Sequence, residues 1–197
     1  MAWLTLALAA IWGALGLGMR SWLHTRRTGR SPLRRGAGPG GWLAIVGVTL
    51  AFVAGPVADL AWGPTRLVHS SWLTGAGLAL AVSALAFLLW AQAAMGESLR
   101  IGLDPTERTV LVTSGPFRWV RNPIYTAMIA YVVGIAMLVP NPASLVAVAA
   151  LVTGEELQVR RVEEPYLAAV HGNTYNTYAS RVGRFLPSMG RIASPGV

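Results

Sequence analysis

Residues 71–95 read SWLTGAGLALAVSALAFLLWAQAAM, a run that contains no charged side chain. About 20 apolar residues in helical geometry are enough to cross the hydrocarbon core of a bilayer. The run is longer than the core helix of an ordinary soluble domain and is bounded by polar residues on both sides. It therefore predicts a transmembrane helix.

Four further apolar stretches flank this one and predict an all-α, polytopic integral membrane protein with about five transmembrane helices. The stretches cover residues 1–19, 41–62, 123–139 and 143–159. Pro56 is expected to kink the second of them, and Pro140-Asn141-Pro142 separates the last two. The first stretch is not a typical signal peptide, because its charged cluster follows the apolar run.

The composition supports a membrane environment and excludes several other classes. The chain is 54% hydrophobic with only 12% charged residues, whereas a soluble domain carries about 25% charged residues. A basic chain can bind nucleic acid, but here the arginines lie between apolar runs and no nucleic-acid partner is expected. The absence of cysteine excludes disulfides and thiolate sites, and the three histidines are scattered, so no metal site is expected.

The distribution of arginine predicts an orientation in the membrane. Fifteen of the sixteen arginines fall in the two loops and the tail that alternate to one side, and Arg66 alone falls opposite. The positive-inside rule then places the N-terminus outside and the C-terminus in the cytoplasm. Tryptophans near the ends of the stretches suggest aromatic belts, at Trp3, Trp22, Trp42, Trp62, Trp72 and Trp90.

The chain is expected to form a single membrane domain over residues 1–197, without internal repeats. Residues 1–95 supply three spans, and residues 96–197 supply two spans with the polar segments that carry any chemistry. The Ala/Gly-rich, lysine-free composition is typical of a GC-rich bacterial source. The predicted location is therefore a bacterial cytoplasmic (inner) membrane.

The first polar segment contains LVTSGPFRWVRNPIY at residues 111–125. Gly115-Pro116 predicts a turn, and Pro123 suits the first turn of a helix that Asn122 caps. A helix N-terminus beside Arg118 and Arg121 favours binding of a carboxylate or phosphate. The alternative is that both arginines only mark the cytoplasmic side.

The second polar segment covers residues 155–187. Pro165 suits the start of a new helix, which Gly172 ends. Two tyrosines three residues apart, Tyr175 and Tyr178, share one face of the next helix. The adjacent Glu163 and Glu164 require solvent or a partner near a bilayer surface, so a water-facing role and a functional role both remain open.

These two segments resemble the isoprenylcysteine carboxyl methyltransferases and the related bacterial phospholipid and small-molecule methyltransferases. The family element L-V-T-S-G-x-[YF]-x-[WY]-x-R-H-P-x-Y is matched by Leu111–Tyr125. The element E-E-x-x-L-x-x-x-[FH]-G-x-x-Y-x-x-Y-x-x-x-V, followed by a proline, is matched by Glu163–Val182 and Pro187. The resemblance begins near Met95 and departs from the family at Asn122, where the usual residue is histidine.

The resemblance implies an S-adenosylmethionine-dependent methyltransferase with S-adenosylhomocysteine as product. Its cytoplasmic C-terminal helices would cover the cofactor, and a lipid or hydrophobic small molecule would enter from the bilayer. Arg121 is then the candidate for orienting an anionic acceptor, and Glu164 the candidate for assisting a protic one. The cofactor-binding candidates are Gly115, Pro116, Arg118, Asn122, Pro123, Tyr125, Glu163, His171, Tyr175 and Tyr178.

Two alternatives belong to other classes. Membrane sterol-type reductases that use NADPH share a similar turn, but they place Asn after the proline and Gly-Glu after the tyrosine. Here Asn122 precedes Pro123, and Thr126-Ala127 follows the tyrosine. A non-catalytic assembly protein has no sequence signature, and a transporter would carry more charge at mid-membrane depth than Asp59 alone.

Overall fold

The computed structural model describes residues 1–19, 21, 25–26, 39–96 and 110–192. This described part is helical, and its single isolated β-bridge does not extend into a strand. The long helices are α1 (Ala2–Trp12, continued by a π-helix over Gly13–Met19), α3 (Pro39–Trp62), α4 (Ser71–Met95), α5 (Pro123–Leu138) and α6 (Pro142–Gln158). The short ones are a 3₁₀ turn, η3 (Gly115–Arg118), a π-helical segment, η4 (Val159–Glu163), then α7 (Glu164–His171) and α8 (Asn173–Arg181).

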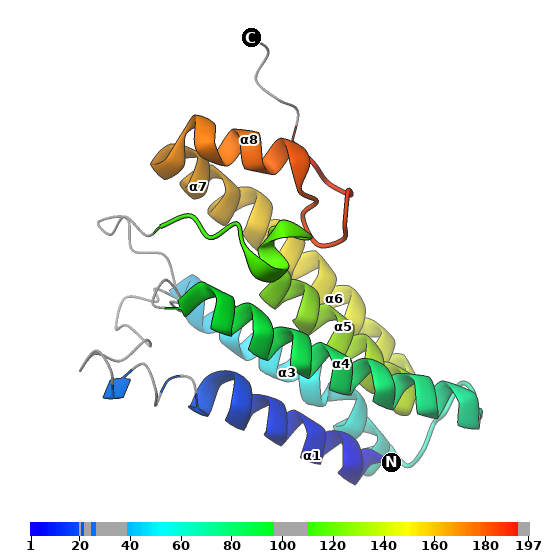
Figure 1. Cartoon of the computed structure of the whole chain (residues 1–197). Helices are drawn as coiled ribbons and strands as arrows, with labels where there is room; N and C mark the ends of the chain where they lie inside the picture. Colours follow the sequence, from blue (N-terminus) through cyan, green and yellow to red (C-terminus); the bar gives the residue numbers. More distant parts are fainter. Residues whose placement is uncertain (20, 22–24, 27–38, 97–109, 193–197) are drawn as a thin grey trace.

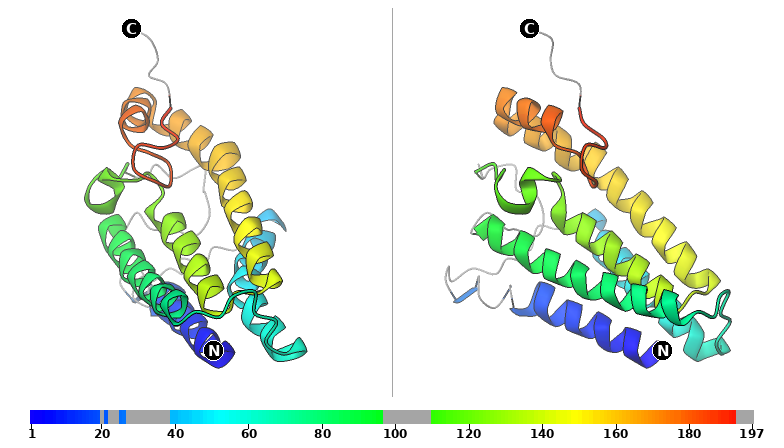
Figure 2. Two further views of the ribbon diagram at one scale, coloured as in Figure 1. Left: turned by 90° about the vertical axis from the view of Figure 1, so that its right-hand side faces the viewer. Right: turned by 45° about the vertical axis from the view of Figure 1, so that its right-hand side comes forward.

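The five long helices lie side by side, and α7 and α8 lie together beyond one end of them (Figure 1; Figure 2). The closest neighbours are α4 with α5 and α3 with α6. The N-terminus lies at the end opposite α7 and α8 (Figure 1). All five predicted apolar stretches are therefore helical, and the stretch at residues 71–95 has the bounds of α4.

Membrane-spanning capacity is clearest for α4. Within the described residues it is the one helix that is long and apolar enough to cross a membrane by length and composition. Shorter apolar helices cover Ala2–Gly16, Val46–Trp62 and Pro123–Leu138. The all-helical fold class is thus confirmed for the described part, and the number of about five spans stays a prediction.

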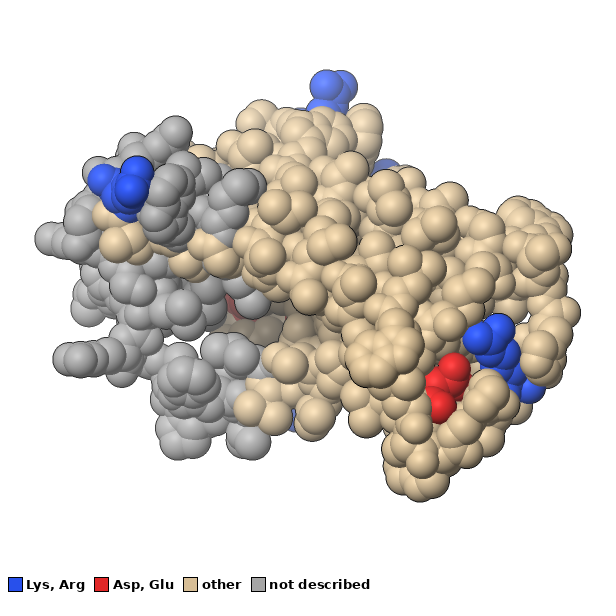
Figure 3. All heavy atoms as spheres, turned by 90° about the horizontal axis from the view of Figure 1, so that it is seen from below, with Lys and Arg blue, Asp and Glu red and all other residues tan. Residues whose placement is uncertain are grey.

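The described charged residues lie mainly toward the two ends of the helix bundle. The connection from α3 to α4, which contains Arg66, lies at the end opposite α7 and α8 (Figure 1). Figure 3 views one long face, on which charged side chains form only a few isolated groups. The predicted one-sided charge and the orientation in the membrane stay predictions. The remaining loop positions lie outside the described residues, namely Trp22, Arg20, Arg27, Arg30, Arg34, Arg35, Arg100 and Arg108, and so does the side chain of Trp42.

An aromatic cluster joins three helices in the core. The ring centroids of Trp12 and Tyr131 are 4.4 Å apart, and those of Phe52 and Tyr131 are 5.1 Å apart. All three side chains are buried. Such offset or tilted ring pairs add to the stability gained from burial. The N-terminal half of the chain is therefore packed directly against α5.

Asp59, in the last turn of α3, has a hydrogen-bond partner on another part of the fold. Asn141 caps α6, because its side-chain oxygen accepts a hydrogen bond from the Ser144 amide at 2.8 Å. Its side-chain nitrogen donates to the Gly55 carbonyl at 2.9 Å and to Asp59 Oδ1 at 3.3 Å. Buried polar groups are stable only when hydrogen-bonded. The cluster fastens α6 to α3, which continues as a helix through Pro56.

Two glycines allow α4 and α5 to approach closely. A Cβ atom at Gly77 would lie 2.8 Å from the Gly134 carbonyl oxygen, and a Cβ at Gly134 would lie 2.8 Å from the Gly77 oxygen. Real Cβ atoms do not approach backbone atoms so closely. Small residues at helix contacts are typical of membrane helices, whose association depends on close packing. This contact positions α5, whose first turn carries the site described below.

Substitution of Gly77 by alanine is expected to destabilise the protein by about 1–3 kcal/mol, because the added methyl group forces α4 and α5 apart. The matched control is Gly75→Ala on the same helix, where a Cβ meets nothing within 4 Å. Thermal unfolding in detergent, followed by far-ultraviolet circular dichroism, measures both. Equal melting temperatures for the two variants would contradict the proposed helix contact.

Candidate active site

The two sequence segments meet through their backbones. Val120 and Gly183 form an isolated parallel bridge, and the Arg121 amide donates to the Gly183 carbonyl at 2.8 Å. The Asn122 amide donates to the Arg184 carbonyl at 3.1 Å. The chain that leads into α5 is therefore joined directly to the chain that leaves α8.

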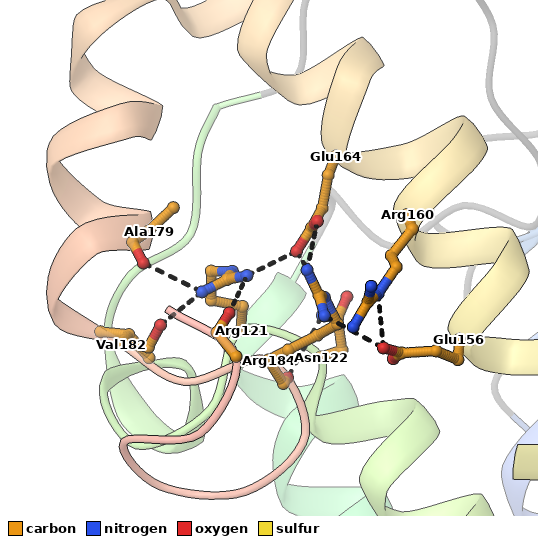
Figure 4. Close-up of polar contacts among 9 residues, drawn as sticks. Arg121, Asn122, Glu156, Arg160, Glu164, Ala179, Val182 and Arg184 are labelled. Atoms are coloured by element: carbon orange, nitrogen blue, oxygen red, sulfur yellow. Dashed lines mark hydrogen bonds and ion pairs between the residues drawn. The ribbon is translucent and has the colours of Figure 1, made fainter. Parts of the chain in front are cut away.

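Arg121 lies inside this junction, with a side chain that is 2% exposed. One terminal nitrogen donates to the carbonyls of Ala179 at 3.0 Å and Val182 at 2.5 Å. The other donates to the Gly190 carbonyl at 3.0 Å and to Glu164 Oε1 at 2.5 Å. Figure 4 shows the guanidinium of Arg121 enclosed by the C-terminal segment and α7. Its two terminal nitrogens are thus occupied within the protein.

Glu164 is held between two guanidinium groups. Besides Arg121, it binds Arg184 in a bidentate manner, with Nε to Oε1 at 2.8 Å and a terminal nitrogen to Oε2 at 2.9 Å. Arg184 also reaches Glu156 Oε1 at 3.1 Å, which in turn pairs with Arg160 at 2.5 Å (Figure 4). We call these five side chains the arginine–glutamate network. Bidentate Arg–carboxylate pairs are among the strongest charged hydrogen bonds in proteins.

The network keeps its central carboxylate ionised. Burial raises the pKa of Glu164, but hydrogen bonds from Arg184 and Arg121 outweigh it, so that the net pKa lies below the usual value. The hydrogen bond to Glu164 raises the pKa of Arg184 in turn. The structure therefore pairs Arg121 and Glu164 with each other, and their predicted roles toward an acceptor remain predictions.

Glu163 has the opposite environment, although it is the adjacent residue. Its Oε1 accepts a hydrogen bond from the Tyr125 hydroxyl in the first turn of α5. Burial raises the pKa of Glu163, the negative charge of Glu164 raises it further, and hydrogen bonds from Tyr125 and Gln158 oppose the rise. Within the described residues no arginine pairs with Glu163. A second buried carboxylate, Glu155, lies near enough to interact with it electrostatically.

The tyrosines predicted to share a face of α8 do so. The rings of Tyr175 and Tyr178 meet edge to face with centroids 6.4 Å apart. The Tyr178 hydroxyl donates to the Phe117 carbonyl at 2.6 Å and so connects α8 to η3. Tyr175 is 2% exposed, and burial raises the pKa of its hydroxyl to about 12. Both rings therefore lie close to the junction of the two segments.

The remaining predicted residues differ in what they contact. Pro123 begins α5 and Asn122 occupies its N-cap position, but the Asn122 side chain donates to the Arg184 carbonyl at 3.2 Å and does not cap the helix. His171 ends α7, and its Nε2 is buried with no hydrogen-bond partner within the described part. Arg118 is exposed and stands outside the arginine–glutamate network.

Arg184 was not among the residues predicted from sequence, although it connects several elements of this site. Its carbonyl accepts from the backbone and side chain of Asn122, and its side chain reaches α6 and α7. The only available sequence signal is its position two residues beyond Val182, where the family element ends. The sequence around an arginine in a basic tail does not indicate whether its side chain is buried, so the pattern alone did not identify Arg184.

An apolar hollow at the described surface lies elsewhere. It has a volume of about 480 Å³ and lies between α3 and α6, where it is lined by apolar side chains such as Ala51, Val146 and Ala147. None of the predicted site residues contributes to it. The candidate site is therefore defined by side-chain contacts at the junction of α5, α7 and α8.

Comparison with known proteins agrees with this arrangement. A family profile described as phospholipid methyltransferase matches residues 72–174, just over half of the chain. Protein-S-isoprenylcysteine O-methyltransferase B of Arabidopsis thaliana is 28% identical over 133 residues, which cover 66% of this chain and 67% of the relative. The matched residues include both polar segments up to the start of α8.

A solved structure shows the same fold. It is that of the eukaryotic intramembrane Ras methyltransferase ICMT (isoprenylcysteine carboxyl methyltransferase), with a TM-score of 0.58 at 21% identity. The similarity covers 79% of this chain but only 55% of that one, so the chain spans little more than half the length of the structural relative. The family profile matches more than half of this chain, and the fold agrees with that match. The chain therefore belongs to the phospholipid methyltransferase family and resembles the isoprenylcysteine carboxyl methyltransferases.

Proposed function

We propose that the protein transfers a methyl group from S-adenosylmethionine to a lipid or hydrophobic small molecule at the arginine-rich, cytoplasmic face of a bacterial inner membrane. Family membership supports methyl transfer and a membrane location. The cofactor, the acceptor and the face are the proposed parts. One observation carries the proposal, namely that two adjacent glutamates have opposite electrostatic environments.

Glu164 is neutralised by two arginines, whereas Glu163 is bonded to a neutral tyrosine. A half-buried carboxylate without a positive partner is costly, because burial removes the water that stabilises its charge. A bound cation removes this cost. S-adenosylmethionine carries an α-ammonium and a sulfonium, so Glu163 is the better placed of the two predicted carboxylates for holding it.

The nearby aromatic residues fit the same ligand. The partly exposed Tyr178 supplies a ring surface beside the junction, and the buried Tyr175 packs edge to face against it. Aromatic faces attract cations and stack on planar bases. The buried, unpartnered Nε2 of His171 offers a further polar contact. The cofactor, when bound, supplies an activated methyl group. The protein supplies position, which alone can lower the barrier of a displacement by several kcal/mol.

The acceptor is proposed to be hydrophobic and to present a carboxylate, a thiol or an amine. A carboxylate needs no base, whereas a protic acceptor must lose a proton. Asn122 has no basic atom at neutral pH, and its side chain is already bonded to the Arg184 carbonyl. The hydrogen-bonded pair of Tyr125 and Glu163 is a described group that can hold such a proton.

The test is calorimetric titration of the detergent-purified protein with S-adenosylhomocysteine, with NADPH as a parallel ligand. We expect saturable one-to-one binding of S-adenosylhomocysteine and no binding of NADPH. A folded sample that binds neither ligand would contradict the cofactor assignment. Binding of NADPH alone would support the sterol-type reductase alternative.

A further inference from the structure

Two exposed tryptophans lie near opposite ends of α4. Trp72 and Trp90 are 77% and 42% exposed and lie eighteen residues apart on this uncharged helix. At a rise of 1.5 Å per residue they are separated by about 27 Å, close to the roughly 30 Å of a bilayer core. Tryptophan side chains prefer the membrane–water interface. Trp90 therefore marks the interface at the end of α4 that faces the candidate site.

The turn η3 is fixed at the level of Trp90. The rings of Trp90 and Trp119 meet edge to face, with centroids 5.2 Å apart. Gly115 lets the turn approach α4, because its φ is +59° and a Cβ there would lie 3.1 Å from Ala94 Cβ. Both contacts hold the segment between η3 and α5 against the end of α4. The site residues that follow, Arg121 and Asn122, are thereby held near the same level.

Two exposed side chains lie at the level of Trp90, the basic one of Arg118 and the aromatic one of Trp119. Trp119 is 51% exposed and Arg118 is exposed as well. No hydrogen bond or ion pair holds Arg118 within the described residues, in contrast to Arg121 and Arg184. Further along α4, toward Trp72, exposed apolar side chains include Leu78 and Val82. An unpaired arginine at the polar edge of an apolar surface fits the phosphate layer of a membrane.

We propose that Arg118, Trp119 and Trp90 form a surface that binds the phosphodiester group of an anionic membrane phospholipid. The guanidinium pairs with the phosphate, and the two indoles lie at the boundary between headgroups and acyl chains. The bound lipid fixes the depth of the segment leading into α5, beside which a hydrophobic acceptor would enter. This inference rests on the membrane location of the family and is independent of the cofactor proposed above.

The test is thermal unfolding of the detergent-purified chain with added phosphatidylglycerol, phosphatidylcholine or inorganic phosphate. We expect phosphatidylglycerol to raise the melting temperature more than phosphatidylcholine, and inorganic phosphate to have no effect. Arg118→Gln should weaken phosphatidylglycerol binding roughly fivefold, which corresponds to the contribution of one basic residue at an anionic surface. Trp119→Ala should lose a similar part of the stabilisation.

The matched control is Arg161→Gln, which removes the same charge from an exposed position on η4. It should retain the effect of phosphatidylglycerol. The proposal is wrong if Arg118→Gln responds like the wild type, if Arg161→Gln loses as much, or if inorganic phosphate reproduces the shift. Arg118 is also a predicted cofactor-binding residue, so a loss of affinity of Arg118→Gln for S-adenosylhomocysteine in detergent would assign it to the cofactor instead and contradict the proposal.

Discussion

Replacement of Glu164 by alanine is expected to destabilise the protein by about 3–5 kcal/mol, the usual cost of removing one partner from a buried ion pair. The carboxylate lies between Arg121 and Arg184, whose side chains are 2% and 11% exposed. Its removal leaves Arg121 buried without a carboxylate partner and leaves Arg184 with only the more exposed Glu156. Thermal and denaturant unfolding in detergent measure the loss, which should be the largest of any single substitution in the arginine–glutamate network.

The matched control is Glu156→Ala, because Glu156 belongs to the same network but is 32% exposed and pairs with the exposed Arg160. Exposed pairs contribute about 0–1 kcal/mol, so this variant should remain close to the wild type. Similar losses for the two variants would contradict a central role for Glu164. The stability should also depend on pH. Because the pKa of Glu164 is lowered, its contribution to the free energy of unfolding is present above the ordinary carboxyl pKa of 4.5 and is lost in more acidic solution.

Replacement of Glu163 by glutamine is expected to weaken binding of S-adenosylhomocysteine about 10–100-fold, or roughly 1.5–3 kcal/mol, the usual value of a hydrogen bond to a charged group. The substitution keeps the shape of the side chain and removes the charge proposed to face the α-ammonium. The Tyr125 hydroxyl can still donate to the amide oxygen, so folding should be preserved. Calorimetric titration measures the change in Kd.

The pH dependence of this binding distinguishes an electrostatic role from a structural one. Because the pKa of Glu163 is raised above 4.5, its carboxylate takes up a proton at a higher pH than an ordinary glutamate. Binding should therefore weaken as the pH falls through that raised pKa, and the Glu163→Gln variant should show no such change. Glu156→Gln serves as the control that removes an equal charge from the same region. An unchanged Kd in Glu163→Gln would assign the ammonium to another group.

The helices could be predicted from sequence because their signal is local. Long uncharged runs have few alternatives to a helix in an apolar environment, since every backbone polar group must be satisfied within the segment. Residues 71–95 coincide with α4, and Pro165 and Gly172 delimit α7 as predicted. The start of α5 at Pro123 follows from the fixed backbone angle of proline. These features depend on a few neighbouring residues and require no knowledge of the partner.

The contacts of the candidate site could not be predicted in the same way. Arg121 and Glu164 are 43 residues apart in the chain, and the pairing places both in a network that no local pattern reveals. Asparagine commonly caps helices, but the side chain of Asn122 instead donates a hydrogen bond to the Arg184 carbonyl. Arg118 and Arg121 look equivalent in the sequence, whereas one is exposed and the other buried.

The sequence by itself therefore determined the helical class, the positions of the helices and the two family elements. The tertiary structure alone decided which charges neutralise one another, because that depends on distances between segments far apart in the chain. It separated Glu164, held by two arginines, from Glu163, held by a tyrosine. The physical reason is that local sequence fixes backbone geometry, whereas the energy of a charge is fixed by its burial and its partners.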